Sequence, residues 1–92
     1  MSADYQSSVV VSLSKVHEMK ITKGRRRTYL MINNSSGSAI KFDFGVAPSD
    51  FSGESLPAAA RYERDSNPPQ TTVFIRGTTA ADQIINTGQG FE

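Results

Sequence analysis

The chain contains no cysteine and no tryptophan among its 92 residues. Without cysteine it can form neither a disulfide framework nor a thiolate metal site, which excludes the small secreted scaffolds that disulfides hold together. No apolar run approaches the roughly 20 residues that a membrane-spanning helix requires, and the first residues lack the basic and then apolar pattern of a signal peptide. We therefore expect a soluble protein that is stabilised by packing or by assembly.

Residues that carry chemistry are also scarce. The single histidine, His17, has only Glu18 beside it, which falls far short of a zinc ligand set. No serine lies in a nucleophile-elbow sequence, so a Ser/His/Asp triad has no support. The glycines are isolated in different turns and do not form a phosphate-binding loop. The sequence therefore predicts no catalytic residue, no metal and no cofactor, and indicates that the protein is not an enzyme.

Positive and negative charges are nearly balanced over the chain, with a net charge of +1, but they are unevenly distributed. Residues 1–46 carry seven Lys and Arg against three Asp and Glu, a balance of +4, whereas residues 47–92 carry three against six, a balance of −3. Such halves can complement each other within one fold, or they can bring neighbouring copies together, basic face to acidic face. Both possibilities remain open at this point.

What the chain has instead is a series of short segments with the period of two that is typical of half-buried strands. Turn-forming residues separate these segments, and residues 46–57 form a breaker-rich surface loop. About six short strands at this spacing predict an all-β fold, a small antiparallel β-sandwich or barrel. The predicted domain covers residues 9–87, between an N-terminal arm at 1–8 and a flexible C-terminal tail at 88–92. The predicted strands are 9–14, 28–32, 39–45, 58–65, 71–76 and 82–87, and residues 15–20 are expected to be extended as well.

Residues 25–45 are the most specific part of the sequence, and they predict a β-hairpin. Strand 28–32 leads into an Asn/Ser/Gly reversal at 33–38, whose residues tolerate tight turns, and strand 39–45 returns. Tyr29 and Met31 fall on the face opposite to Leu30 and Ile32, so both faces of the first strand are partly covered. The alternation assigns the following side chains to the core: Leu30, Ile32, Ile40, Phe42, Phe44, Val73 and Ile75.

A basic turn precedes this hairpin, and we expect it to display three guanidinium groups to solvent. Exposed arginines could bind phosphates or carboxylates of a partner in a bidentate manner. Alternatively, they discourage edge pairing and pair with Glu63, Asp65 or Asp82. Two aromatic residues in the predicted arms could be buried against neighbouring subunits. The candidate partner-binding residues are Lys23, Arg25, Arg26, Arg27, Tyr5 and Phe91.

Single-stranded nucleic acid is a competing partner for the same region. Residues 41–45 could form a platform on which bases stack, while Lys20, Lys23 and the arginines follow the backbone. Two features weaken this interpretation: the phenylalanines lie on the more continuous apolar face, and Asp43 in the middle of the platform would repel phosphate. Nucleic acid is therefore the second alternative.

The order Arg26-Arg27-Thr28-Tyr29-Leu30-Met31-Ile32-Asn33, followed by an Asn/Ser/Gly reversal and an aromatic strand that ends in Phe44-Gly45, resembles small virion structural proteins of tailed bacteriophages. The resemblance covers residues 20–64 and implies a β-sandwich located in the virion, in many copies or as a homo-oligomer. The implied partners are major capsid or tail proteins, and the implied role is that of a capsid decoration or cement protein that stabilises the shell. A head–tail or tail accessory protein, or a fibre-type adhesion module, is the first alternative.

Overall fold

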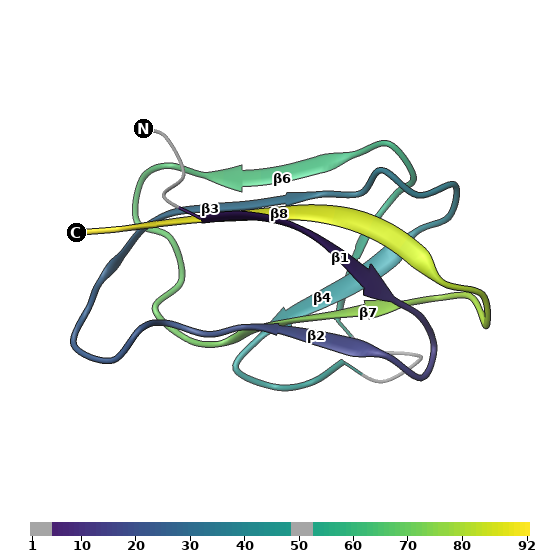
Figure 1. Cartoon of the computed structure of the whole chain (residues 1–92), viewed down its shortest axis with the longest axis horizontal. Helices are drawn as coiled ribbons and strands as arrows, with labels where there is room; N and C mark the ends of the chain where they lie inside the picture. The colour runs from purple at the N-terminus through teal and green to yellow at the C-terminus, as the bar shows by residue number, and fades with distance from the viewer. Residues whose placement is uncertain (1–4, 49–52) are drawn as a thin grey trace.

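The computed structural model describes residues 5–48 and 53–92, and it confirms an all-β fold. Two four-stranded antiparallel sheets, with strand orders β1-β8-β3-β6 and β2-β7-β4-β5, pack face to face as a small β-sandwich (Figure 1). No helix of a length and apolarity that would cross a membrane occurs in these residues. The strands are β1 (Tyr5–Val11), β2 (Val16–Met19), β3 (Arg27–Asn33), β4 (Ile40–Phe44), β5 (Glu54–Leu56), β6 (Arg61–Arg64), β7 (Val73–Gly77) and β8 (Gln83–Phe91).

The core lies between the inner faces of the two sheets, as the period of two requires. Six of the seven predicted core residues are fully or almost fully buried, whereas Phe44 is only partly buried and packs against the edge of the core. The short strand β5 was not predicted, because it lies within the breaker-rich segment 46–57; residues 49–52 of that segment fall outside the described residues. The six buried residues are Leu30, Ile32, Ile40, Phe42, Val73 and Ile75.

The predicted hairpin of residues 25–45 is wrong, because its two strands lie in different sheets. β3 pairs with β8 and β6, whereas β4 pairs with β7 and β5. The two apolar faces therefore meet across the core and do not lie side by side in one sheet. Residues 34–39 carry the chain from one layer to the other, and the fully buried Asn34 holds this crossover. Its amide nitrogen donates hydrogen bonds to the carbonyl oxygens of Ser38, Leu56 and Pro57 over 2.9, 2.9 and 3.0 Å.

The outer face of β3 is covered as well, as its sequence predicts. Tyr29 and Met31 are buried although they point away from the core. In the neighbouring strand they lie opposite Gly90 and Gly88, respectively. Because directly paired residues share one face of a sheet, the missing glycine side chains leave room for the tyrosine and the methionine to lie against β8.

The predicted arms need correction. β1 begins at Tyr5 and pairs with β8 along its whole length, from Tyr5 opposite Gln89 to Val11 opposite Gln83. β8 itself continues to Phe91, whose side chain is only 8% exposed. The segment 88–92 is therefore not a flexible tail, and the arm predicted at 1–8 is a strand from residue 5 onward; residues 1–4 lie outside the described residues. β8 pairs with β1 on one side and with β3 on the other, and these ladder hydrogen bonds make both segments part of the sheet.

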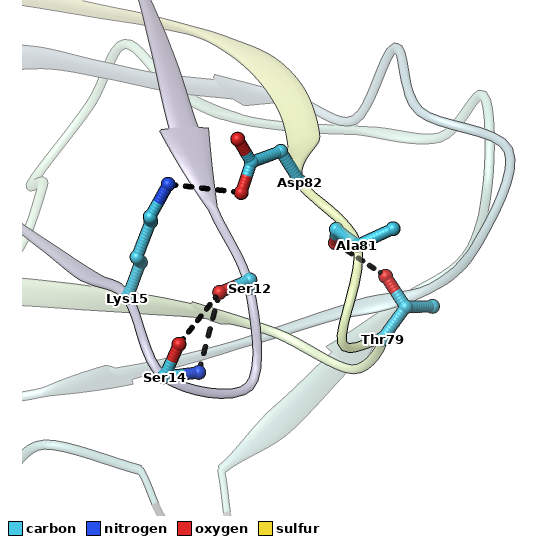
Figure 2. A network of polar contacts seen from close by, with 6 residues as sticks. All are labelled: Ser12, Ser14, Lys15, Thr79, Ala81 and Asp82. Atoms are coloured by element: carbon cyan, nitrogen blue, oxygen red, sulfur yellow. Dashed lines mark hydrogen bonds and ion pairs between the residues drawn. The ribbon is translucent and has the colours of Figure 1, made fainter.

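At the end of the sandwich opposite to the start of β1 and the end of β8, a tight corner joins β1 to β2 (Figure 2). The Ser12 hydroxyl oxygen accepts a hydrogen bond from the Ser14 amide over 3.2 Å, and Lys15 forms an exposed ion pair of 2.9 Å with Asp82 in the β7–β8 connection. The amide of Gly77 donates to the carbonyl oxygen of Ser12 over 3.2 Å. A β-carbon at Gly77 would lie 2.5 Å from the Cα of Ser12 and 2.8 Å from its backbone nitrogen, so this corner requires glycine.

We predict that Gly77→Ala destabilises the protein by about 2 kcal/mol, because the new methyl group overlaps backbone atoms that cannot move independently. Gly37→Ala is the matched control: a β-carbon there meets nothing within 4 Å, and the φ of Gly37 is not positive. Urea denaturation of both variants measures the difference. Equal stabilities of the two alanine variants would contradict the close packing of the corner.

Candidate interaction surface at the basic end

The loop of residues 20–26 connects β2 to β3 at one end of the sandwich, the end at which β1 begins and β8 ends (Figure 1). The strand register explains this arrangement. Tyr5 pairs with Gln89, and Arg27 pairs with Phe91, two residues further along β8. The fold thus brings the predicted partner-binding residues to one end of the molecule, although their roles differ from one to the next.

Arg27 is not a surface residue, and its predicted exposure is wrong. The side chain is 0% exposed, and all its nitrogens donate hydrogen bonds to neutral oxygens. Nε and one terminal nitrogen donate to Oε1 of Gln89 over 2.9 and 2.7 Å. The terminal nitrogens also donate to the carbonyl oxygens of Pro69, Thr71 and Met19 over 2.6, 2.8 and 3.0 Å. These acceptors compensate for the loss of water around a buried cation.

The backbone of Arg27 is fixed as firmly as its side chain. Its amide donates to Oε1 of Gln70 over 2.9 Å, and Nε2 of Gln70 donates back to its carbonyl oxygen over 2.7 Å. Burial lowers the pKa of Arg27, but a guanidinium stays protonated in proteins because its pKa is so high. Arg27 therefore places a permanent positive charge inside the fold and joins β8, the end of β2 and the segment before β7.

The two preceding arginines remain exposed but hold the end of the chain. The guanidinium carbon of Arg25 lies 5.5 Å from the ring centroid of Phe91, and its Nε donates to the carbonyl oxygen of Glu92 over 3.0 Å. Arg26 forms an ion pair of 3.8 Å with the Glu92 carboxylate, with both side chains more than half exposed. Such an exposed pair contributes little to stability, so both guanidinium groups stay accessible to a partner. Phe91, by contrast, is buried within its own subunit.

Lys20 and Lys23 complete this surface. Both are exposed, and neither forms an ion pair with a residue of the described ranges. We call the group of Lys20, Lys23, Arg25 and Arg26 the basic end. Beside it lies a hollow of about 520 Å³ lined by Lys20 and Phe74, among others. The strand register places Glu18 and Asp43 on either side of Phe74, so the positive surface ends at this hollow.

The acidic residues expected to neutralise the arginines have other partners. Glu63 forms a 3.0 Å ion pair with Arg61 and accepts a hydrogen bond from the Tyr29 hydroxyl. Asp82 pairs with Lys15, and Asp65 is exposed and in no ion pair of the described residues. Two ion pairs, Lys15–Asp82 and Arg26–Glu92, join the basic half of the chain to the acidic half. The charge asymmetry is thus partly complemented within one fold.

The two phenylalanines of the platform proposed for nucleic acid pack at the core. Phe42 is buried, and its ring centroid lies 5.7 Å from that of Phe44 and 5.0 Å from that of Tyr62. Tyr62 and Phe44 are 6.1 Å apart, so the three rings pack on one another. Bases cannot stack on the buried ring of Phe42, and the packing against Phe42 and Tyr62 leaves Phe44 only partly exposed.

His17 does not contribute to a cluster of reactive groups. It is half-buried on β2, opposite Ile75, and burial lowers its pKa while the charge of Glu18 opposes that shift. Within residues 5–48 and 53–92, no three His, Cys, Asp or Glu side chains lie close enough together to hold a metal ion.

We predict that Arg27→Met lowers the free energy of unfolding by about 3 kcal/mol or more, because it leaves several buried carbonyl groups without a donor. Arg26→Met is the matched control and should change stability by less than about 0.5 kcal/mol, as an exposed site does. Arg27→Lys should also be destabilised, since one ammonium group cannot reach all the acceptors. Chemical denaturation of the three variants tests this, and equal losses at positions 26 and 27 would refute it.

A second prediction concerns the Tyr29–Glu63 hydrogen bond, which holds the pKa of Glu63 below its ordinary 4.5 and raises the pKa of Tyr29. A lowered carboxyl pKa stabilises the fold above the unfolded-state pKa, and this contribution is lost as the pH falls through the folded-state pKa. Tyr29→Phe should therefore raise the pKa of Glu63, as measured by carboxyl NMR titration. The stability gap between wild type and variant should narrow below about pH 4. Tyr62→Phe is the control, and an unchanged Glu63 pKa in Tyr29→Phe would disprove the assignment.

No family model, no curated protein and no solved structure matches the chain.

Proposed function

We propose that this protein is a non-enzymatic structural protein of a tailed-bacteriophage virion, and that it docks on the assembled particle through its basic end. The primary role is that of a capsid decoration or cement protein. The resemblance of residues 20–64 to small phage virion proteins supports the class of protein. The observation that carries the mode of binding is the gathering of four exposed cations on the loop of residues 20–26, at one end of the sandwich.

Electrostatics favours an acidic protein surface as the docking site. Lys20 and Lys23 have no counter-ion among the described residues, and the partner of Arg26, Glu92, is itself exposed. Complementary charge steers encounter and orients the bound domain. Each contact is weak at physiological ionic strength, so firm attachment requires several of them together or many copies on a shell.

The rigid attachment of the loop supports this role. Residues 20–26 are anchored at one end by Met19, whose carbonyl oxygen binds Arg27, and at the other end by Arg27 itself. Arg25 and Arg26 are further held against the end of β8. A loop fixed in this way loses less conformational entropy when it binds than a free loop would. A partner that binds only the folded domain would also stabilise its small core by mass action.

The alternatives differ in how well the geometry suits them. A tail accessory protein or a fibre-type adhesion module could use the same basic end and would differ only in its position on the particle. A single-stranded nucleic-acid-binding role is less well supported, because Phe42 and Phe44 pack with Tyr62 in the molecule.

The test is the occupancy of purified virions assembled with variant chains. The double variant Lys23→Ser, Arg26→Ser should reduce occupancy about tenfold, since two exposed ionic contacts together contribute roughly 1.4 kcal/mol. The control, Lys15→Ser, Arg61→Ser, removes the same charge and also breaks exposed ion pairs, but elsewhere on the surface.

Equal occupancy of the two double variants would contradict docking by the basic end, and absence of the wild-type chain from virions would contradict the function itself. Binding of the isolated protein to oligo-dT at about 50 mM salt, lost at about 200 mM, would instead favour the nucleic-acid alternative.

A further inference from the structure

The two sheets leave four edge strands, and three of them are protected against pairing with another chain. An open edge presents free backbone donors and acceptors, and proteins commonly protect it with charges, prolines or short strands. β2 has four residues and includes Glu18, β5 has three and is followed by Pro57, and β6 consists of Arg61, Tyr62, Glu63 and Arg64. Each of these edges is short and carries at least one charged side chain.

β1 is the exception. It is the fourth edge, it has seven residues, and its sequence Tyr-Gln-Ser-Ser-Val-Val-Val contains no charged residue and no proline. On its outer side Val10 is 43% exposed and lies opposite the exposed Ile84. By the usual rules of sheet edges, such a strand is a template for a further strand.

The backbone of this edge is open within the described part of the chain. β1 pairs with β8 on one side only. The backbone hydrogen bonds outside the sheets begin at Ser12, where the chain turns toward β2. Every second residue of an edge strand directs its amide and carbonyl groups away from the sheet, so β1 offers a row of such groups without partners in residues 5–48 and 53–92.

We propose that β1 pairs with β1 of a second copy of this chain. The two strands run antiparallel and are related by a two-fold axis at Ser8, so that the two four-stranded sheets that contain β1 form one continuous sheet of eight strands. Such an interface is isologous and closed, so it forms a dimer rather than a filament. The proposal goes beyond the proposed function and does not require a phage particle.

Two arguments favour a second copy at this register. Paired residues in antiparallel strands share one face of the sheet, so a two-fold axis must pass through a residue that faces itself. Ser8 is the central residue of β1, and an axis there uses the whole strand: Ser7 faces Val9 of the second copy, and Gln6 faces Val10. No like charges meet, because the strand carries none. The stem of Gln6 then covers the exposed Val10 of the second copy.

The arrangement has a consequence for the basic end. β1 starts at the end of the sandwich where the basic loop lies. Antiparallel pairing therefore directs the two basic ends in opposite directions along the joined sheet. A dimer of this kind could bind two separate acidic sites at once, which is the geometry expected of a clamp between neighbouring subunits.

The first test is sedimentation velocity over a range of protein concentrations. The wild-type chain should dimerise reversibly. Ser8→Lys should weaken the dimer at least about tenfold, because both lysines would face each other on the axis. Ser66→Lys, at an exposed site in the β6–β7 connection, should leave the dimer unchanged. A wild-type chain that stays monomeric at all concentrations, or a Ser8→Lys dimer as stable as the wild-type dimer, would overturn the proposal.

The second test addresses the register and does not depend on the folding of Ser8→Lys. The chain has no cysteine, so Ser8→Cys introduces a single thiol. Opposite residues of paired strands have β-carbons about 5 Å apart, and a short bismaleimide should therefore cross-link Ser8→Cys far faster than Ser66→Cys at the same concentration. Equal cross-linking rates would reject the two-fold axis at Ser8. Capture of β1 by a foreign strand, with no self-association, would likewise refute the second copy as its partner.

Discussion

The buried guanidinium group of Arg27 holds together the segments that meet at the basic end of the molecule. Among the described residues, Arg27 has no carboxylate as a hydrogen-bond acceptor; three backbone carbonyls and one amide oxygen surround it instead. Because the donors of a guanidinium are fixed in one plane, the acceptors must keep their positions as well. The end of β2, the segment before β7 and the end of β8 are therefore held together by one side chain. An apolar core brings two sheets into contact, and directional hydrogen bonds of this kind select one relative placement.

The opposite end of the sandwich is closed in the same way by two buried amides. Asn34 binds the carbonyl oxygens of Leu56 and Pro57. Gln83 donates to the carbonyl oxygens of Ser38 and Ala39 over 3.1 Å and accepts from the amide of Thr78 over 2.7 Å. Within the described residues, no buried side-chain nitrogen or oxygen is without a partner. The fold is thus an apolar layer between two polar ends, and each end depends on side chains whose hydrogen bonds are fully satisfied.

The approximate positions of seven of the eight strands and most of the core could be predicted from the sequence, because the pleat imposes a period of two on any strand with one buried face. The partners of the strands could not, since residues 34–38 have the same turn chemistry in a hairpin and in a crossover between sheets. Long-range contacts distinguish the two, among them the hydrogen bonds of Asn34 to residues 22 and 23 positions away. The burial of Arg27 could not be predicted for a similar reason. Its acceptors Pro69, Thr71 and Gln89 are 42 to 62 residues away in the sequence. No local pattern distinguishes it from Arg25 and Arg26.

The two surfaces proposed for association are separated in space by the geometry of a sheet. The basic end lies along the strand direction, where loops project, whereas the β1 edge lies across it, where the hydrogen bonds of a sheet point. Charges on β2 and β6 protect other edges, and the cations of residues 20–26 are confined to a loop that contributes no strand. A partner at the basic end therefore leaves β1 accessible, and a second copy at β1 leaves the cations accessible. A domain with two such separate surfaces can take part in two interfaces at once.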